Sequence, residues 1–256
     1  MIERAAVSYN GKEASYRRYR LPDLAWAGVL IVATTILFWV MDLDLTVARF
    51  FYDAGNSGRA FPEGQREVWK FLSGVVPLLT AGLGVGGVGV LIAGCFWKNF
   101  RRRRIHAVFI ILSVALGPGL VTNAVFKPHF GRPRPRQTVE FGGELDYLPV
   151  LVPGSNEKGR SFAGGDSSVG FAFCVFYFLY RRRRPGFARC WLAFSIMLGL
   201  AIGTARIAAG AHFLSDVLWS GYSSYLVALV VYYFGLRVPH REDLLEEAAI
   251  RGARPD

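Results

Sequence analysis

Long uncharged apolar stretches constrain this chain more than any other feature of its sequence. Five of them contain no Asp, Glu, Lys or Arg: residues 24–41, 71–97, 105–126, 190–205 and 217–236. About 20 apolar residues in a helix cross the roughly 30 Å of hydrocarbon in a bilayer. A sixth stretch, 167–180, is shorter and spans only if its flanking residues reach the interface. The sequence therefore predicts an all-α integral membrane bundle of six transmembrane helices.

The net charge of +11 is concentrated in three basic clusters. They precede span 1, separate spans 2 and 3, and separate spans 4 and 5, so they share one side if the spans alternate. An excess of Lys and Arg marks the cytoplasmic side of a membrane protein. We expect both termini there, and we interpret the clusters as topology signals and contacts with anionic lipid. A nucleic-acid partner is not expected.

The predicted organisation has three parts. Residues 1–22 form a basic amphipathic arm on the cytoplasmic surface, 23–236 form the transmembrane domain, and 237–256 form a charged cytoplasmic tail. The first span begins too late and is too long for a cleavable signal peptide. Loop 127–166 then lies outside, and so does loop 42–68, in which we see no chemical signal.

A basic segment interrupts the outer side, where cations are usually avoided. Residues 127–136 read Lys-Pro-His-Phe-Gly-Arg-Pro-Arg-Pro-Arg, with four cations within ten residues. Prolines and a glycine keep this stretch stiff and non-helical, so its cations are presented from a fixed backbone. Arg offers a planar fork for phosphate oxygens, and Lys adds a mobile charge. The segment predicts a phosphate site, with contact to anionic headgroups as the alternative.

A second outer element carries a candidate nucleophile. His212 and Asp216 are four residues apart, which on a helix places both on one face within reach of each other. A carboxylate bonded to one imidazole nitrogen fixes the tautomer and leaves the other nitrogen free to attack. Arg206 lies six residues before His212, on the same side as the basic segment. A purely structural His–Asp pair is the alternative, and the nearby cations favour chemistry.

The third outer element lies directly before the short span. It reads Ser-Phe-Ala-Gly-Gly-Asp-Ser-Ser at 161–168 and contains Gly165 and Asp166. Glycine permits close backbone approach, and exposed amides at a helix N-terminus bind oxyanions. A plain loop-to-helix cap is the alternative interpretation.

Together these elements predict metal-free phosphoryl transfer. Lys127, Arg134 and Arg206 would clamp a phosphate. His212 would attack phosphorus, and the amide of Gly165 would take part of the remaining oxygen charge. Transfer of this kind needs a nucleophile, an orienting base and dense positive charge. The four His residues show no metal-ligand spacing, so we expect no metal and no other cofactor.

The order of these motifs resembles the type-2 phosphatidic acid phosphatase superfamily over about residues 70–236. The family's first motif, K-x6-R-P, and its third, S-R-x5-H-x3-D, match at Lys127, Arg134 and Pro135, then at Arg206, His212 and Asp216. Ala205 stands where the third motif has Ser. The resemblance implies a helical membrane core, a phosphohistidine intermediate on His212 and no cofactor.

The middle motif departs from the family pattern. Where the family has P-S-G-H, this chain has Ala163-Gly164-Gly165-Asp166, and only Gly165 agrees. The resemblance implies that the family's His protonates the leaving oxygen, so Asp166 stands at the position of the acid. Asp side chains ordinarily have a pKa of about 3.9 and are ionised at pH 7. We therefore interpret Asp166 as a substitute acid or, alternatively, as a residue that orients the substrate.

The middle region also carries a narrower similarity. The run Gly-Asp-Ser-Ser-Val-Gly-Phe at 165–171, with Phe-Gly-Gly at 141–143, is similar to a bacterial branch related to lipid A 4'-phosphatases. This similarity implies a phosphorylated glucosamine disaccharide lipid, dephosphorylated at the periplasmic face of the inner membrane. Four further cations would then contact a second phosphate or the sugar, or else ordinary headgroups: Arg132, Arg136, Lys158 and Arg160.

Other functions stay open at this point. Within the same chemistry, the rivals are an undecaprenyl diphosphate phosphatase, a phosphatidylglycerophosphate phosphatase and a phosphotransferase that passes the phosphate to a second lipid. A non-catalytic phospholipid-binding protein is motivated by the altered middle motif, although a pure binder has no need of an oriented nucleophile. The sequence gives no indication of oligomeric state.

Overall fold

The computed structural model describes residues 2–56, 60–101, 103–154 and 159–252, and the regular secondary structure in these ranges is helical, with no β-strand among them. Five helical segments are long and apolar enough to cross a membrane: Arg20–Val40, Glu67–Phe96, Arg104–His129, Pro185–Ala208 and Leu214–Gly235. A shorter apolar segment, Gly165–Tyr180, adds a sixth. The prediction of an all-α bundle of six membrane helices is therefore confirmed. Helices dominate because a backbone in hydrocarbon has to satisfy its hydrogen bonds internally.

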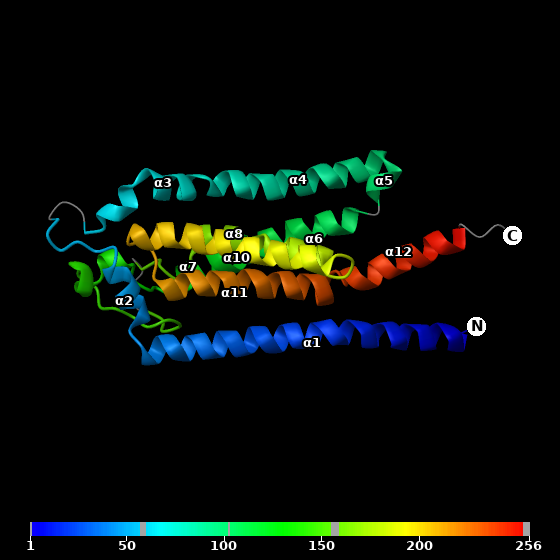
Figure 1. Ribbon diagram of the computed structural model, residues 1–256, viewed down its shortest axis with the longest axis horizontal. Helices are drawn as coiled ribbons and strands as arrows, with labels where there is room; N and C mark the ends of the chain where they lie inside the picture. Colours follow the sequence, from blue (N-terminus) through cyan, green and yellow to red (C-terminus); the bar gives the residue numbers. More distant parts are fainter. Residues whose placement is uncertain (1, 57–59, 102, 155–158, 253–256) are drawn as a thin grey trace.

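The centre of the bundle is built from four segments that pack closely (Figure 1). They are α6 (Arg104–Val114) with its continuation η2 (Ala115–Phe126) and α7 (Lys127–His129), α8 (Gly165–Ala172) with α9 (Cys174–Tyr180), α10 (Pro185–Ala208), and α11 (Leu214–Val230) with η5 (Val231–Gly235). The ring of Tyr232 lies 5.4 Å from both Phe109 and Phe178, between centroids. These aromatic contacts fasten three of the four segments to one another.

Two outer segments flank this centre, α1 (Ile2–Val40) and the pair α3 (Glu67–Gly74) and α4 (Val76–Phe96), on opposite sides in Figure 1. Large apolar side chains on both are exposed, among them Trp26 on α1 and Leu78 on α4. Such exposure suits contact with lipid chains. α1 runs from Ile2 to Val40 without a break, so residues 2–22 of the predicted arm belong to the same helix as the first span.

The two ends of the bundle differ in what they carry. The start of α1 and α12 (Val238–Gly252) lie at one end, together with α5 (Lys98–Arg101) (Figure 1). The other end holds α2 (Leu43–Arg49), α7 and the short helices η1 (Pro62–Gln65), η3 (Pro135–Gln137) and η4 (Val139–Phe141). Trp39 Nε1 donates to the carbonyl of Val150 at 2.9 Å, so the end of α1 is fastened to the loop that follows α7. The predicted site residues gather at this second end.

Candidate active site

His212 lies in the turn between α10 and α11. Gly210 has a φ of +59°, a left-handed conformation that glycine adopts readily, and it lets the chain reverse. His212 is nearly buried, and its Nδ1 lies 2.6 Å from the carbonyl oxygen of Ser161. A carbonyl only accepts, so Nδ1 carries the hydrogen and Nε2 keeps its lone pair. The tautomer that a nucleophile requires is thus set by a backbone atom.

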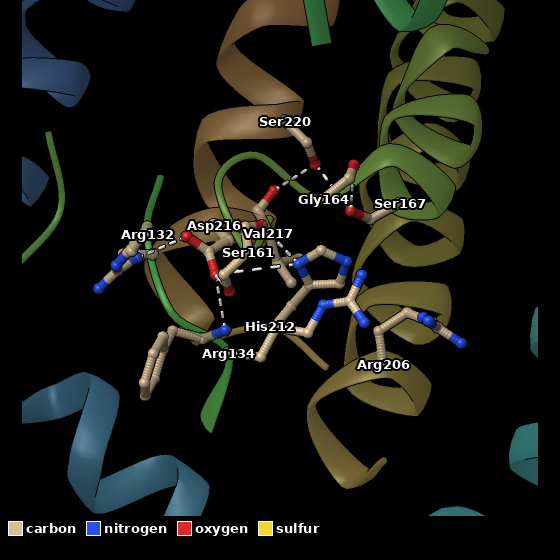
Figure 2. A network of polar contacts seen from close by, with 12 residues as sticks. Arg132, Arg134, Ser161, Gly164, Ser167, Arg206, His212, Asp216, Val217 and Ser220 are labelled. Atoms are coloured by element: carbon tan, nitrogen blue, oxygen red, sulfur yellow. Dashed lines mark hydrogen bonds and ion pairs between the residues drawn. The ribbon is translucent and has the colours of Figure 1, made fainter. Parts of the chain in front are cut away.

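This arrangement corrects the expected role of Asp216. His212 precedes α11, which begins at Leu214, so the two residues are not one turn apart on a single helix. Asp216 Oδ2 lies 3.9 Å from His212 Nδ1, beyond hydrogen-bond distance. It accepts instead from the Phe213 N–H at 2.8 Å and from Ser161 Oγ at 2.5 Å. Asp216 therefore fixes the turn that carries His212 and ties it to the loop that carries Ser161 (Figure 2).

Arg132 forms a buried ion pair with Asp216. One of its terminal nitrogens lies 2.5 Å from Asp216 Oδ1 and the other 2.8 Å from Asp44 Oδ2. Burial alone would lower the pKa of Arg132, but the two carboxylates raise it, so the guanidinium stays charged. The side chain is only 1% exposed. The predicted headgroup contact for Arg132 is therefore wrong, because its charge is enclosed by protein.

Asp44 joins this site from α2, in the loop that we expected to be without chemistry. Its carboxylate accepts from the Ser215 N–H at 2.8 Å and from Ser215 Oγ at 2.5 Å, beside Arg132. The expectation for loop 42–68 was wrong because the partners of Asp44 are distant in the sequence. A single acidic residue between Leu43 and Leu45 was the only local sign that it is buried.

The predicted phosphate-binding cations converge on one side of His212. In Figure 2 the Arg134 and Arg206 side chains lie on the His212 side of the network, and Arg134 points toward the imidazole. Burial lowers the pKa of the Arg134 guanidinium, and the neighbouring cations Arg136, Arg206 and Arg160 lower it further. Arg134 Nε is buried without a hydrogen-bond acceptor among the described residues. Crowded cations with an unused donor favour an anion.

The start of α8 closes the other side of this cluster. A Cβ added at Gly165 would lie 2.6 Å from Asn123 Oδ1 and 3.2 Å from Lys127 Nζ, so a larger residue would displace the Asn123 amide and crowd the Lys127 ammonium at the first turn of α8. Asp166 follows at once, and its Oδ2 lies 3.2 Å from Arg206 Nε. The structure thus brings Lys127, Arg206, Gly165 and Asp166 together.

Two of the other cations predicted to contact the headgroup lie around Arg134 at the edge of the site. Arg136 and Arg160 are exposed, and both act electrostatically on Arg134. Lys158 lies outside the described residues. Within the described part of the chain, no group of three or more His, Cys, Asp and Glu residues is arranged to hold a metal ion.

Comparison with known proteins agrees with the motifs. Residues 106–238, just over half of the chain, match the model of the PAP2 superfamily. A lipid A 4'-phosphatase of Francisella tularensis subsp. novicida is 31% identical over 80% of this chain and 92% of its own length. One of Rhizobium leguminosarum is 32% identical over 79% and 85%, and a lipid A 1-phosphatase of Rhizobium etli is 23% identical over 84% and 89%. No solved structure matches significantly. The chain belongs to the PAP2 superfamily and is a phosphoric monoester hydrolase.

Proposed function

We propose that this protein is a metal-independent lipid A 4'-phosphatase that works through a phosphohistidine intermediate on His212. One observation carries the proposal. The Nε2 lone pair of a buried, tautomer-fixed imidazole lies beside a cluster of cations, and one of them, Arg134, has a buried Nε donor without an acceptor in the described part of the chain. A phosphate monoester satisfies that donor and brings its phosphorus to the nucleophile.

The reaction follows from this geometry in two displacements. His212 Nε2 attacks phosphorus in line, the bond from phosphorus to the sugar oxygen breaks, and that oxygen leaves with a proton. Water then attacks the phosphohistidine and releases inorganic phosphate. Lys127, Arg134 and Arg206 neutralise the charge on the equatorial oxygens in both steps, which is the main work of catalysis in phosphoryl transfer.

Asp166 is proposed as the group that protonates the leaving oxygen. Without phosphate it forms an ion pair with Arg206. A phosphate dianion that takes over Arg206 breaks this ion pair and leaves the Asp166 carboxyl group beside the bound phosphate. After transfer, the resulting carboxylate is suited to activate the water.

Lipid A as substrate is supported by the names of the relatives. Three of them, 30–32% identical to this chain, are lipid A 4'-phosphatases, whereas the lipid A 1-phosphatase is only 23% identical. The exposed Arg136 and Arg160 beside the site suit a second phosphate or the sugar of such a lipid.

We place the protein in a bacterial inner membrane with the site in the periplasm. The basic α5 lies at the opposite end of the bundle, together with the start of α1 and with α12, as expected for cytoplasmic segments (Figure 1).

The test is phosphate release by the purified protein in detergent, without added metal, against a panel of lipids. The panel contains lipid A, undecaprenyl diphosphate, phosphatidylglycerophosphate and phosphatidic acid, and mass spectrometry of the lipid A product locates the lost phosphate. We expect release of free phosphate from the 4' position. Preference for another lipid would overturn the assignment of substrate. Loss of lipid phosphate without release of inorganic phosphate would indicate a phosphotransferase.

The acid role of Asp166 predicts a dependence on the leaving group. We expect Asp166→Asn to slow hydrolysis of lipid A by about 10²-fold or more, because an amide cannot donate the required proton. An aryl phosphate with an acidic phenol leaves without protonation, so its hydrolysis should fall less than about tenfold. Rates for both substrates are compared between the variant and the parent. Equal losses would assign Asp166 to the positioning of Arg206.

The backbone contact to His212 predicts a graded loss at its supporting residues. Ser161→Ala removes one donor to Asp216 but keeps the carbonyl that holds Nδ1, so we expect about a tenfold lower kcat. In Asp216→Asn the amide NH₂ group faces donors that the carboxylate accepted from, so the turn that carries His212 is held less firmly. We expect kcat to fall by about 10²-fold. Steady-state kinetics check this order. A loss in Asp216→Asn as large as that of removing His212 would indicate that Asp216 acts directly in the reaction.

A further inference from the structure

A cavity of about 920 Å³ lies between α4, α6, α9 and α12. These helices meet toward the end of the bundle that carries α5 and α12, away from the candidate active site (Figure 1). The volume lies within the roughly 300–1,000 Å³ of small-molecule sites. None of the residues proposed for the reaction lines this cavity.

The body of the cavity is apolar and open along α4. Gly82 and Gly86 line it on one side, facing Ile110, Phe176 and Leu179. A Cβ added at either glycine would meet nothing within 4 Å, so this part of α4 is bare backbone beside empty space. At Gly87, by contrast, an added Cβ would lie 2.7 Å from Ile111 Cγ1, so α4 and α6 touch there. The space therefore persists beside a close helix contact and has room for an extended hydrocarbon chain.

The mouth of the cavity is cationic. Arg103 comes from the connection before α6, whereas Arg183 and Arg184 come from the turn before α10, yet all three line the same cavity. Glu242 also lines the cavity, and its carboxylate lies 2.7 Å from His106 Nε2 and 3.0 Å from an Arg182 nitrogen. An apolar body behind three arginines matches an acyl chain behind a phosphate.

We propose that this cavity binds one anionic phospholipid of the leaflet opposite to the active site. An acyl chain lies along the glycines of α4, and the phosphate contacts Arg103, Arg183 and Arg184. Arginines that serve only as topology signals need to be on the correct side of the membrane and nothing more. Arg103 is 80 residues from Arg183 in the sequence, yet both line the same cavity together with Arg184, which favours a shared ligand. A soluble anion would leave the apolar body unused. The proposal depends on the membrane fold and is independent of the reaction.

The experiment is native mass spectrometry of the delipidated protein, titrated in detergent with phosphatidylglycerol and, separately, with phosphatidylcholine. We expect one phosphatidylglycerol to bind more tightly than phosphatidylcholine. Each substitution among Arg103→Gln, Arg183→Gln and Arg184→Gln should weaken it about fivefold. Gly86→Leu fills the apolar body and should weaken it at least about tenfold, since several buried CH₂ groups are displaced.

Two matched variants control for nonspecific effects. Gly89→Leu adds the same side chain to the same helix, also into open space, but outside the residues that line the cavity. Arg189→Gln removes an exposed charge near the same turn, again outside the cavity. Both should bind like the parent. Parent-like binding in Gly86→Leu, loss of binding in Gly89→Leu, or equal affinity for both lipids would each overturn the proposal. Unchanged phosphate release by Gly86→Leu shows that this variant is folded.

Discussion

Replacement of His212 by Ala is expected to lower phosphate release by about 10⁴-fold or more, as removal of a nucleophile does in other enzymes. The cations would still bind the phosphate, so KM should change much less than kcat. In the proposed mechanism Lys127, Arg134 and Arg206 hold the phosphate, and only the group that forms the new bond is lost. The measurement is release of inorganic phosphate under saturating lipid, combined with binding of the unreacted lipid.

The control for this experiment is His129→Ala. His129 lies at the same end of the bundle, is exposed, and has its Nδ1 2.7 Å from the Val125 carbonyl. Loss of this imidazole should leave kcat within about twofold, because surface substitutions away from a site have small effects. A parent-like rate in His212→Ala would contradict the proposed nucleophile. Equal losses in both variants would indicate a general response to loss of an imidazole.

A second test of the same step is chemical. The parent protein mixed with substrate and quenched rapidly in alkali should carry one acid-labile phosphate, which is the behaviour of a phosphorus–nitrogen bond. His212→Ala should carry none. Labelling of the variant would place the intermediate on another residue and would contradict the mechanism independently of its rate.

The membrane helices were predictable because the physics that selects them is local. An uncharged stretch of some 20 residues has few alternatives to a helix in hydrocarbon. The basic segment with Lys127 and Arg134 was visible for a related reason, since clustered cations on the predicted outer side break a strong charge pattern. In each case the signal lies within one short window of sequence.

The support of the nucleophile was not predictable, because it depends on contacts between distant residues. Asp44 and Arg132 are 88 residues apart and meet only when α2 folds against the loop after α7. The atom that fixes His212 is the backbone carbonyl of Ser161, 51 residues away, and a carbonyl has no signature in a sequence. The spacing of His212 and Asp216 correctly suggested proximity. It could not show that the helix begins between them and turns the carboxylate toward other donors.

Replacement of Arg132 is expected to give the largest loss of stability among these variants. Arg132→Leu leaves two buried carboxylates, Asp44 and Asp216, without their shared counter-charge. Removing one partner of a buried ion pair costs about 3–5 kcal/mol, because the other partner stays desolvated and uncompensated. For a chain of this size that corresponds to a melting temperature lower by roughly 6 °C or more. Thermal unfolding in detergent measures it, with Arg136→Leu in the same loop as the exposed control.

A double variant separates the loss of charge balance from the loss of packing. Asp44→Asn in the Arg132→Leu background removes one of the two stranded charges, so the double variant should be more stable than the sum of the single effects predicts. Coupling of about 1–3 kcal/mol is expected for residues in one such network. Strict additivity would show that Arg132 contributes through packing on Phe213 and Tyr147, whose ring centroids lie 4.7 and 5.7 Å from its Cζ. Recovered stability without recovered kcat would show that Asp216 still needs the guanidinium to hold the His212 turn in its active geometry.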